Sequence, residues 1–172
     1  MSAKLTIRGE TDDWAMFSRT PTGGPPIFIR SRTGLPHVRA FAEKHFFARL
    51  RCTLPPDGLT ETGLPKSTEA LDKFEDALLT ALSAAGARTY LIAVTTGHGA
   101  RDLYFSAADS SELPRAMKSI EGDRPFTTAL AKGDPAPFLK TLTLSQQDRA
   151  KAAYHAVPTG GGSGPLGKLF KS

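Results

Sequence analysis

The sequence has little cysteine and no long apolar run, and each scarcity narrows the class of protein. Only one of the 172 residues is cysteine, which excludes an internal disulfide and a multi-cysteine metal site. No apolar stretch approaches the ~20 residues that a membrane-spanning helix needs. The first residues, MSAKLTIRGETDD, have no apolar segment behind their lysine, so we expect no secretory signal. Together these absences predict a cytoplasmic protein that does not enter a membrane.

The histidines and the cysteine, the residue types that most often bind transition metals, are not spaced as metal ligands in this sequence. None of His37, His45, His98 and His155 lies four residues from another histidine, and no HExxH-type motif is present. Cys52 falls on the apolar side of an alternating segment, where a packed, unreactive thiol is favoured over a nucleophile. We therefore expect no metal and no cofactor.

What the chain does contain is typical of an ordered α+β domain. Hydrophobic residues make up 40% and charged residues 23% of the sequence, as in ordinary globular proteins. We predict a single domain over residues 1–158, with a core at about 45–132 and an N-terminal hairpin at 14–32. The glycine-rich segment 159–172 is predicted to be a flexible tail.

Hydrophobic periodicity places the elements of this domain. Alternation with a period of two, or short β-branched runs, predicts strands at 14–19, 27–32, 45–54, 89–96, 103–107 and 126–132. Apolar residues spaced three and four apart predict helices from Ser67 or Thr68 to Gly86, at 110–120, and in short form at 137–142 and 145–157.

From residue 45 onwards these elements follow the order strand, helix, strand, strand, helix, strand. This βαββαβ succession is that of a ferredoxin-like sandwich, in which two helices cover one face of an antiparallel sheet. The other face is expected to be open. The N-terminal hairpin would either extend the sheet or cover part of that open face.

The segment TTGHGARDLYF, residues 95–105, invites a catalytic or phosphate-binding interpretation. Its Gly-His-Gly centre provides the positive-φ positions that a hairpin turn requires. A phosphate-binding loop would lead into a helix, whereas here a second strand follows. We therefore interpret the segment as a turn, while an enzyme centred on His98, Arg101 and Asp102 is kept as an alternative.

The net charge of +5 favours a binding surface only where the basic residues gather. Alternation places Arg49, Arg51 and Tyr104 on the face of the sheet away from the helices, where cations beside a ring could bind single-stranded nucleic acid. His98 and Arg101 complete the candidate binding surface. Four acidic residues of the first helix are interpreted as solvated: Glu69, Asp72, Glu75 and Asp76.

Several short motifs together resemble a known family. They are a tryptophan in an early strand (Trp14), a GLP motif before a helix (residues 63–65), a Phe-Glu pair (Phe74 and Glu75) and a T-x-x-G-x-R-x-x-x-F hairpin (Thr96, Gly99, Arg101 and Phe105). They resemble the uncharacterised bacterial family called domain of unknown function 695, over residues 14–142. Asp134, Pro135 and Phe138 depart from that family's pattern, which often has a tryptophan in the last place.

The resemblance implies little about chemistry. The family has no established activity, and its domain is similar to the ribonuclease E inhibitor B family, whose members act by binding a protein. The resemblance thus implies a non-catalytic protein-binding or regulatory module with an unidentified protein partner, acting alone or as a homodimer. Single-stranded nucleic-acid binding and an enzyme near residues 97–102 are the two alternatives.

Overall fold

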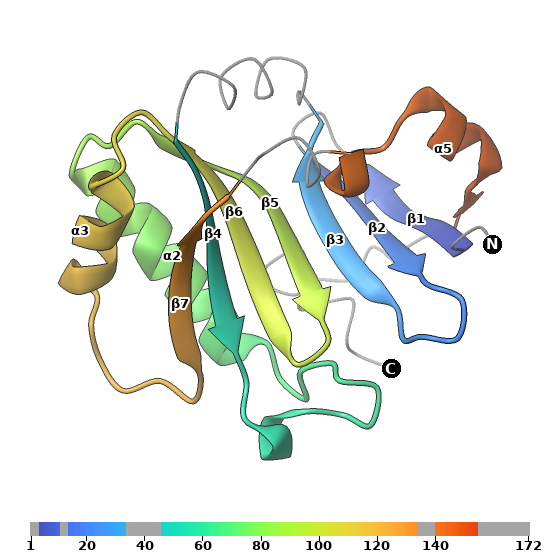
Figure 1. Ribbon diagram of the computed structural model, residues 1–172, viewed down its shortest axis with the longest axis horizontal. Helices are drawn as coiled ribbons and strands as arrows, with labels where there is room; N and C mark the ends of the chain where they lie inside the picture. The colour runs from blue at the N-terminus through green and yellow to red at the C-terminus, as the bar shows by residue number, and fades with distance from the viewer. Residues whose placement is uncertain (1–3, 11–13, 34–45, 134–139, 155–172) are drawn as a thin grey trace.

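Eight strands form one sheet, and helices pack against it (Figure 1). The computed structural model describes residues 4–10, 14–33, 46–133 and 140–154. The strands are β1 (Lys4–Glu10), β2 (Trp14–Thr20), β3 (Ile27–Arg32), β4 (Phe46–Thr53), β5 (Thr89–Gly97), β6 (Ala100–Ala107), β7 (Thr127–Lys132) and β8 (Ala153–Tyr154). The helices are α2 (Glu69–Ala84), α3 (Glu112–Ser119) and α5 (Gln146–Lys151), with a 3-10 turn η1 (Pro56–Gly58).

The strand order is β7-β4-β6-β5-β3-β2-β1-β8. Seven strands pair antiparallel, and the two-residue β8 runs parallel to β1. The predicted α+β class with an antiparallel sheet is therefore confirmed. The sheet continues, however, well beyond the four strands of a ferredoxin-like unit.

The N-terminal strands extend the sheet. β3 pairs with β5, with Phe28 opposite Thr96 and Ser31 opposite Ala93. Strand β1 was not predicted, because its alternating pattern is short and a bulge interrupts its pairing between Ile7 and Gly9. Pairing with β2 on both sides of this bulge supplies backbone hydrogen bonds, so the strand forms although its own sequence pattern is weak.

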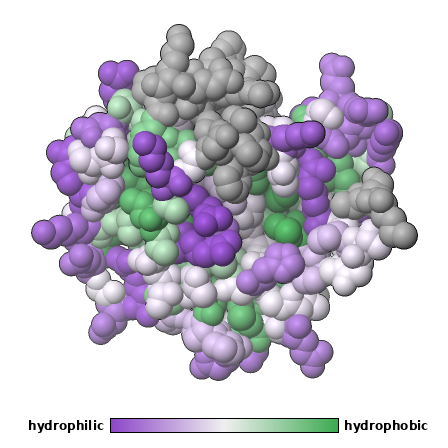
Figure 2. All heavy atoms as spheres, in the orientation of Figure 1, coloured by the Kyte–Doolittle hydropathy of each residue, from purple (hydrophilic) through white to green (hydrophobic). Residues whose placement is uncertain are grey.

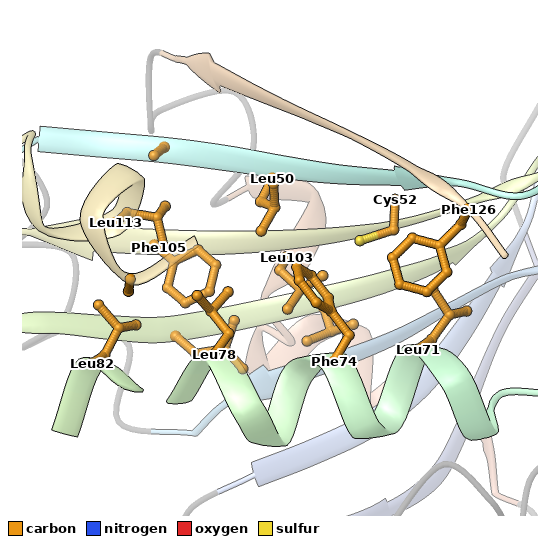
Figure 3. Packing of buried hydrophobic residues seen from close by; sticks show 14 residues of the cluster. Leu50, Cys52, Leu71, Phe74, Leu78, Leu82, Leu103, Phe105, Leu113 and Phe126 are labelled. Carbon is orange, nitrogen blue, oxygen red and sulfur yellow. The ribbon is translucent and has the colours of Figure 1, made fainter. Parts of the chain in front are cut away.

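One apolar core lies between the sheet and α2. Leu71, Phe74, Leu78 and Leu82 recur at three- and four-residue intervals, and all four side chains are buried. They point from α2 towards the sheet (Figure 3). The sheet contributes Leu50, Cys52, Leu103 and Phe105, and Leu113 and Phe126 close the cluster.

The opposite face of the sheet is not open, which corrects the sequence-based expectation. Leu142 is buried against this face together with Phe17, Ile29 and Phe47 in a second apolar cluster. An ion pair of 2.7 Å also joins Arg149 of α5 to Glu10 of β1 at the edge of this region. Seen from this side, hydrophobic patches and hydrophilic side chains lie next to each other (Figure 2).

Some expectations fall outside the described residues. The tail 159–172 and the Asp134–Pro135 pair lie there, as do residues 137–139 of the helix predicted at 137–142 and residues 155–157 of the one predicted at 145–157. The latter is represented by α5, which begins with a capping box between Ser145 and Asp148.

The segment between β5 and β6 is a hairpin turn, as the sequence predicted, and only two residues separate the strands. His98 has a φ of 51° and Gly99 a φ of 77°, the left-handed pair that a tight hairpin requires. The Gly99 N–H donates to the Gly63 carbonyl (2.8 Å), and the Gly99 carbonyl accepts from the Leu54 N–H (3.0 Å). The turn therefore also fixes the loop that leads into α2.

Replacing Gly99 with alanine should destabilise the protein by about 1–2 kcal/mol, because an L side chain is strained at positive φ. The added Cβ would also lie 3.3 Å from Leu59 Cδ1. Urea unfolding measures the effect. The matched control is Gly122→Ala, since that Cβ meets nothing within 4 Å; equal losses in the two variants would contradict this account of the turn.

Candidate functional site

Arg101 is the largest fully buried side chain in the described part of the protein. Alternation along β6 places it on the same face as Leu103 and Phe105, under α2. Its Nη1 donates to Asp72 Oδ1 at 2.7 Å and lies 3.8 Å from Glu75 Oε2. A guanidinium removed from water is tolerated only when carboxylates compensate it. The beginning of α2 is therefore held to the sheet by charge as well as by apolar packing.

Glu75 also binds a second arginine from a distant strand. Nη2 of Arg30 on β3 donates to Glu75 Oε1. The guanidinium carbons of Arg30 and Arg32 lie 4.9 and 4.8 Å from the Trp14 ring centre, within the range of cation–π attraction. We define the arginine cluster as Trp14, Arg30, Asp72, Glu75, Thr96 and Arg101.

Several polar atoms of the arginine cluster are buried without a hydrogen-bond partner among the described residues. They are Nε and Nη2 of Arg101, Nε of Arg30 and Oγ1 of Thr96. Thr96 lies directly opposite Arg101 in the β5–β6 pair, and Arg30 reaches Arg101 through Glu75. The four atoms thus belong to one site, which has more hydrogen-bond donors than the surrounding protein uses.

The interpretation of the acidic helix residues as solvated was wrong for two of them. Glu75 is 6% exposed, and the side chain of Asp72 is 35% exposed. Both flank the apolar stripe of α2 and meet Arg101. A signal was present in the sequence, because Arg101 shares the alternation of Leu103 and Phe105 and so had to be buried under the helix. Glu69 and Asp76 are exposed as expected.

Arg49 and Arg51 lie on the other face of the sheet, as predicted. Arg51 forms a two-point contact with Asp102, through Nε to Oδ1 at 2.8 Å and Nη2 to Oδ2 at 2.7 Å. The hydrogen bonds to this carboxylate raise the pKa of Arg51. The Arg51 side chain is still 45% exposed, so its outer edge reaches solvent.

Tyr104 does not provide the exposed stacking surface that the nucleic-acid hypothesis needs. It is 5% exposed, and its ring packs on Phe47 with a centroid separation of 6.1 Å. Burial raises the pKa of the Tyr104 hydroxyl. Bases cannot stack on a ring that already lies within a core, which removes the main support for this alternative, although binding itself stays a prediction.

The residues of the enzyme alternative do not converge. Arg101 and Asp102 are neighbours on a strand, so their side chains leave opposite faces of the sheet; the first meets α2 and the second meets Arg51. His98 lies at the tip of the hairpin. Among residues 4–10, 14–33, 46–133 and 140–154, no group of three metal-binding side chains is found.

These observations define the class of the protein: an α+β fold with an extended antiparallel sheet, a buried arginine cluster and a tight hairpin. Within that class, the chain belongs to the family of unknown function DUF695, which it matches over residues 12–133. No curated protein and no solved structure matches it. The bacterial source and the similarity to the ribonuclease E inhibitor B family stay predictions.

The match spans the elements that build the arginine cluster, from Trp14 on β2 to Arg101 on β6. No described helix is both long enough and apolar enough to span a membrane. The cytoplasmic location stays a prediction.

Replacing Glu75 with glutamine should lower the free energy of unfolding by about 3 kcal/mol or more, because two buried guanidinium groups lose their shared negative charge. Chemical denaturation measures the change. Glu69→Gln is the matched control on the same helix, since Glu69 is 73% exposed and its ion pair is with the exposed Lys73. Its unfolding midpoint should stay nearly the same, and a similar loss in both variants would contradict a special role for Glu75.

Cys52 should resist alkylation in the native protein. It is 0% exposed, and burial raises the pKa of its thiol to about 12. Iodoacetamide at pH 8, followed by mass spectrometry, should label it slowly in buffer and quickly in urea. Because folding favours the neutral thiol, its contribution to stability is present below the unfolded pKa and is lost as the pH rises towards 12. Equal labelling rates in buffer and urea would contradict this assignment.

Proposed function

We propose that the protein is a non-catalytic binding module that adds an extended acidic peptide to its sheet at the outer edge of β7. The observation that carries this proposal is the regular, exposed edge itself. β7 pairs with β4 over six residues without a register shift, and no other described strand pairs with its outer side. Such an edge offers unpaired N–H and C=O groups in the arrangement that a further strand requires.

The two edges of the sheet differ in their suitability for strand addition. At the far edge, β8 has two residues and β1 carries a bulge, two devices that discourage pairing. β7 contains neither a proline nor a bulge, and its only charge is the terminal Lys132. Its other residues, Thr127 to Ala131, are uncharged. Apart from the two alanines, their strand propensity is neutral to favourable.

The charge near this edge indicates which peptide would bind. Arg49 and Arg51 of β4 lie opposite Ala131 and Ala129 of β7, so all four side chains leave the same face. Alanine does not screen the arginines from the edge. A strand added to β7 would lie about 10 Å from β4 and would bring every second side chain towards these cations. Acidic residues at alternate positions therefore complement the site.

The sheet geometry supports a finer description of the fold as well. The four strands that follow residue 45 are adjacent in the order β7-β4-β6-β5, and α2 contacts α3. We infer that residues 46–132 form a ferredoxin-like unit and that β3, β2 and β1 are additions at its β5 edge. In this description the additions leave β7 as the edge available to a partner.

The test is to select binders from a displayed library of random ten-residue peptides and to titrate the best one into ¹⁵N-labelled protein. We expect acidic residues at alternate positions and chemical-shift changes along β7. Ala129→Glu should weaken binding roughly tenfold or more, about 1.4 kcal/mol, because it repels an acidic strand from the edge.

Ala153→Glu is the matched control, since it places the same charge on β8 at the opposite edge and should leave affinity unchanged. Binding that ignores Ala129→Glu, or the absence of any selected peptide, would refute the proposal. A concentration-dependent dimer that Ala129→Glu abolishes would identify a second copy of the chain as the occupant instead of a peptide.

A further inference from the structure

We propose that the arginine cluster binds the carboxylate group of a small molecule, held by Arg101, Arg30 and Thr96. The site lies under the flank of α2, on the face of the sheet opposite the Arg49 and Arg51 side chains. It is therefore independent of peptide addition at β7.

The unpartnered donors are concentrated at this one place. Six buried side-chain nitrogen and oxygen atoms have no hydrogen-bond partner within the described ranges, and four of them belong to Arg101, Arg30 and Thr96. A buried donor without a partner costs free energy, so native proteins retain few of them. Four in adjacent side chains indicate a site that a ligand with several acceptor oxygens would complete.

The orientation of Arg101 favours a planar carboxylate. Asp72 binds Nη1, which leaves Nε and Nη2, the two donors along one side of the guanidinium group. The same protein shows what this side can hold, because Nε and Nη2 of Arg51 bind both oxygens of Asp102 at 2.8 and 2.7 Å. A carboxylate fits such a pair of parallel donors with both oxygens.

The charges around the site select a monoanion. Arg30 and Arg101 form ion pairs with Glu75 and Asp72. Arg32, which contacts the same Trp14 ring as Arg30, adds a third guanidinium group nearby. One positive charge is left, which a single carboxylate neutralises. A phosphate dianion would exceed this charge and would meet repulsion from Asp72 and Glu75.

Burial limits the size of the ligand. Arg101 is 0% exposed, Thr96 is 1% exposed and Arg30 is 9% exposed. The apolar neighbours in the same rows of the sheet are Phe28, opposite Thr96, and Cys52, opposite Arg101. A free monocarboxylate with a very short apolar portion suits these surroundings better than the terminal carboxylate of a peptide chain.

The experiment measures thermal unfolding in sodium formate and sodium acetate against sodium chloride at equal ionic strength. The wild-type melting temperature should rise with the logarithm of the carboxylate concentration, with no such rise in chloride. The Arg101 Nε–H signal in ¹H–¹⁵N spectra should shift in the same titration. Arg101→Lys keeps the charge but removes the paired donors, so its dissociation constant should be at least tenfold weaker.

Arg115→Lys is the matched control, because the Arg115 side chain lies on α3, is 70% exposed and belongs to neither proposed site; its response to carboxylate should equal that of the wild type. Equal melting-temperature increases in chloride and formate, or an unchanged response in Arg101→Lys, would overturn the proposal.

If Arg101→Lys does not fold, Thr96→Val tests the same site. Removing an unpartnered buried hydroxyl should raise the melting temperature without carboxylate and should weaken formate binding at least threefold. Unchanged binding would overturn the site. An acetylated tripeptide with a free carboxyl end should cause no shift, and binding of this peptide without binding of formate or acetate would refute a small-molecule ligand.

Discussion

A charge removed from water is the constraint on which the arrangement of α2 over the sheet depends. The Arg101 side chain is fully buried beneath α2, with the apolar Cys52 and Leu103 among its neighbours. It is compensated by Asp72 and Glu75 on the first two turns of α2. Apolar packing between a helix and a sheet tolerates sliding by a turn, whereas a buried ion pair does so only at the cost of an uncompensated charge. The ion pairs therefore define where along the sheet the helix begins.

Two further contacts help to fix the position of α2: the backbone hydrogen bonds of the β5–β6 hairpin and the ion pair of Arg30. The hairpin at His98 and Gly99 accepts and donates backbone hydrogen bonds to the chain at Leu54 and Gly63, which sets the entry of the loop that precedes α2. Arg30 then connects the helix, through Glu75, to the strands added beyond β5. The N-terminal strands are therefore held to the rest of the protein in two ways: by the ion pair between Arg30 and Glu75 and by the backbone hydrogen bonds between β3 and β5.

The same construction separates the two proposed sites. The arginine cluster is enclosed between helix and sheet, where low exposure strengthens each hydrogen bond and restricts access to small ligands. The β7 edge is exposed, and Arg49 and Arg51 act there at the surface, where attraction is weaker and depends on salt. The two proposals therefore concern sites that do not overlap, and each can be tested without the other.

The sequence by itself determined the α+β class, most of the strands, the two principal helices and the turn at Gly99, because periodicity and glycine conformation are local properties of the chain. It also placed Arg49 and Arg51 on one face through alternation. Only the tertiary structure decided that Arg30 meets Glu75, that Tyr104 is covered, and that β7 lies at an edge. These outcomes depend on strand order and on segments far apart in the chain, and no local pattern encodes which distant charge a buried arginine will find.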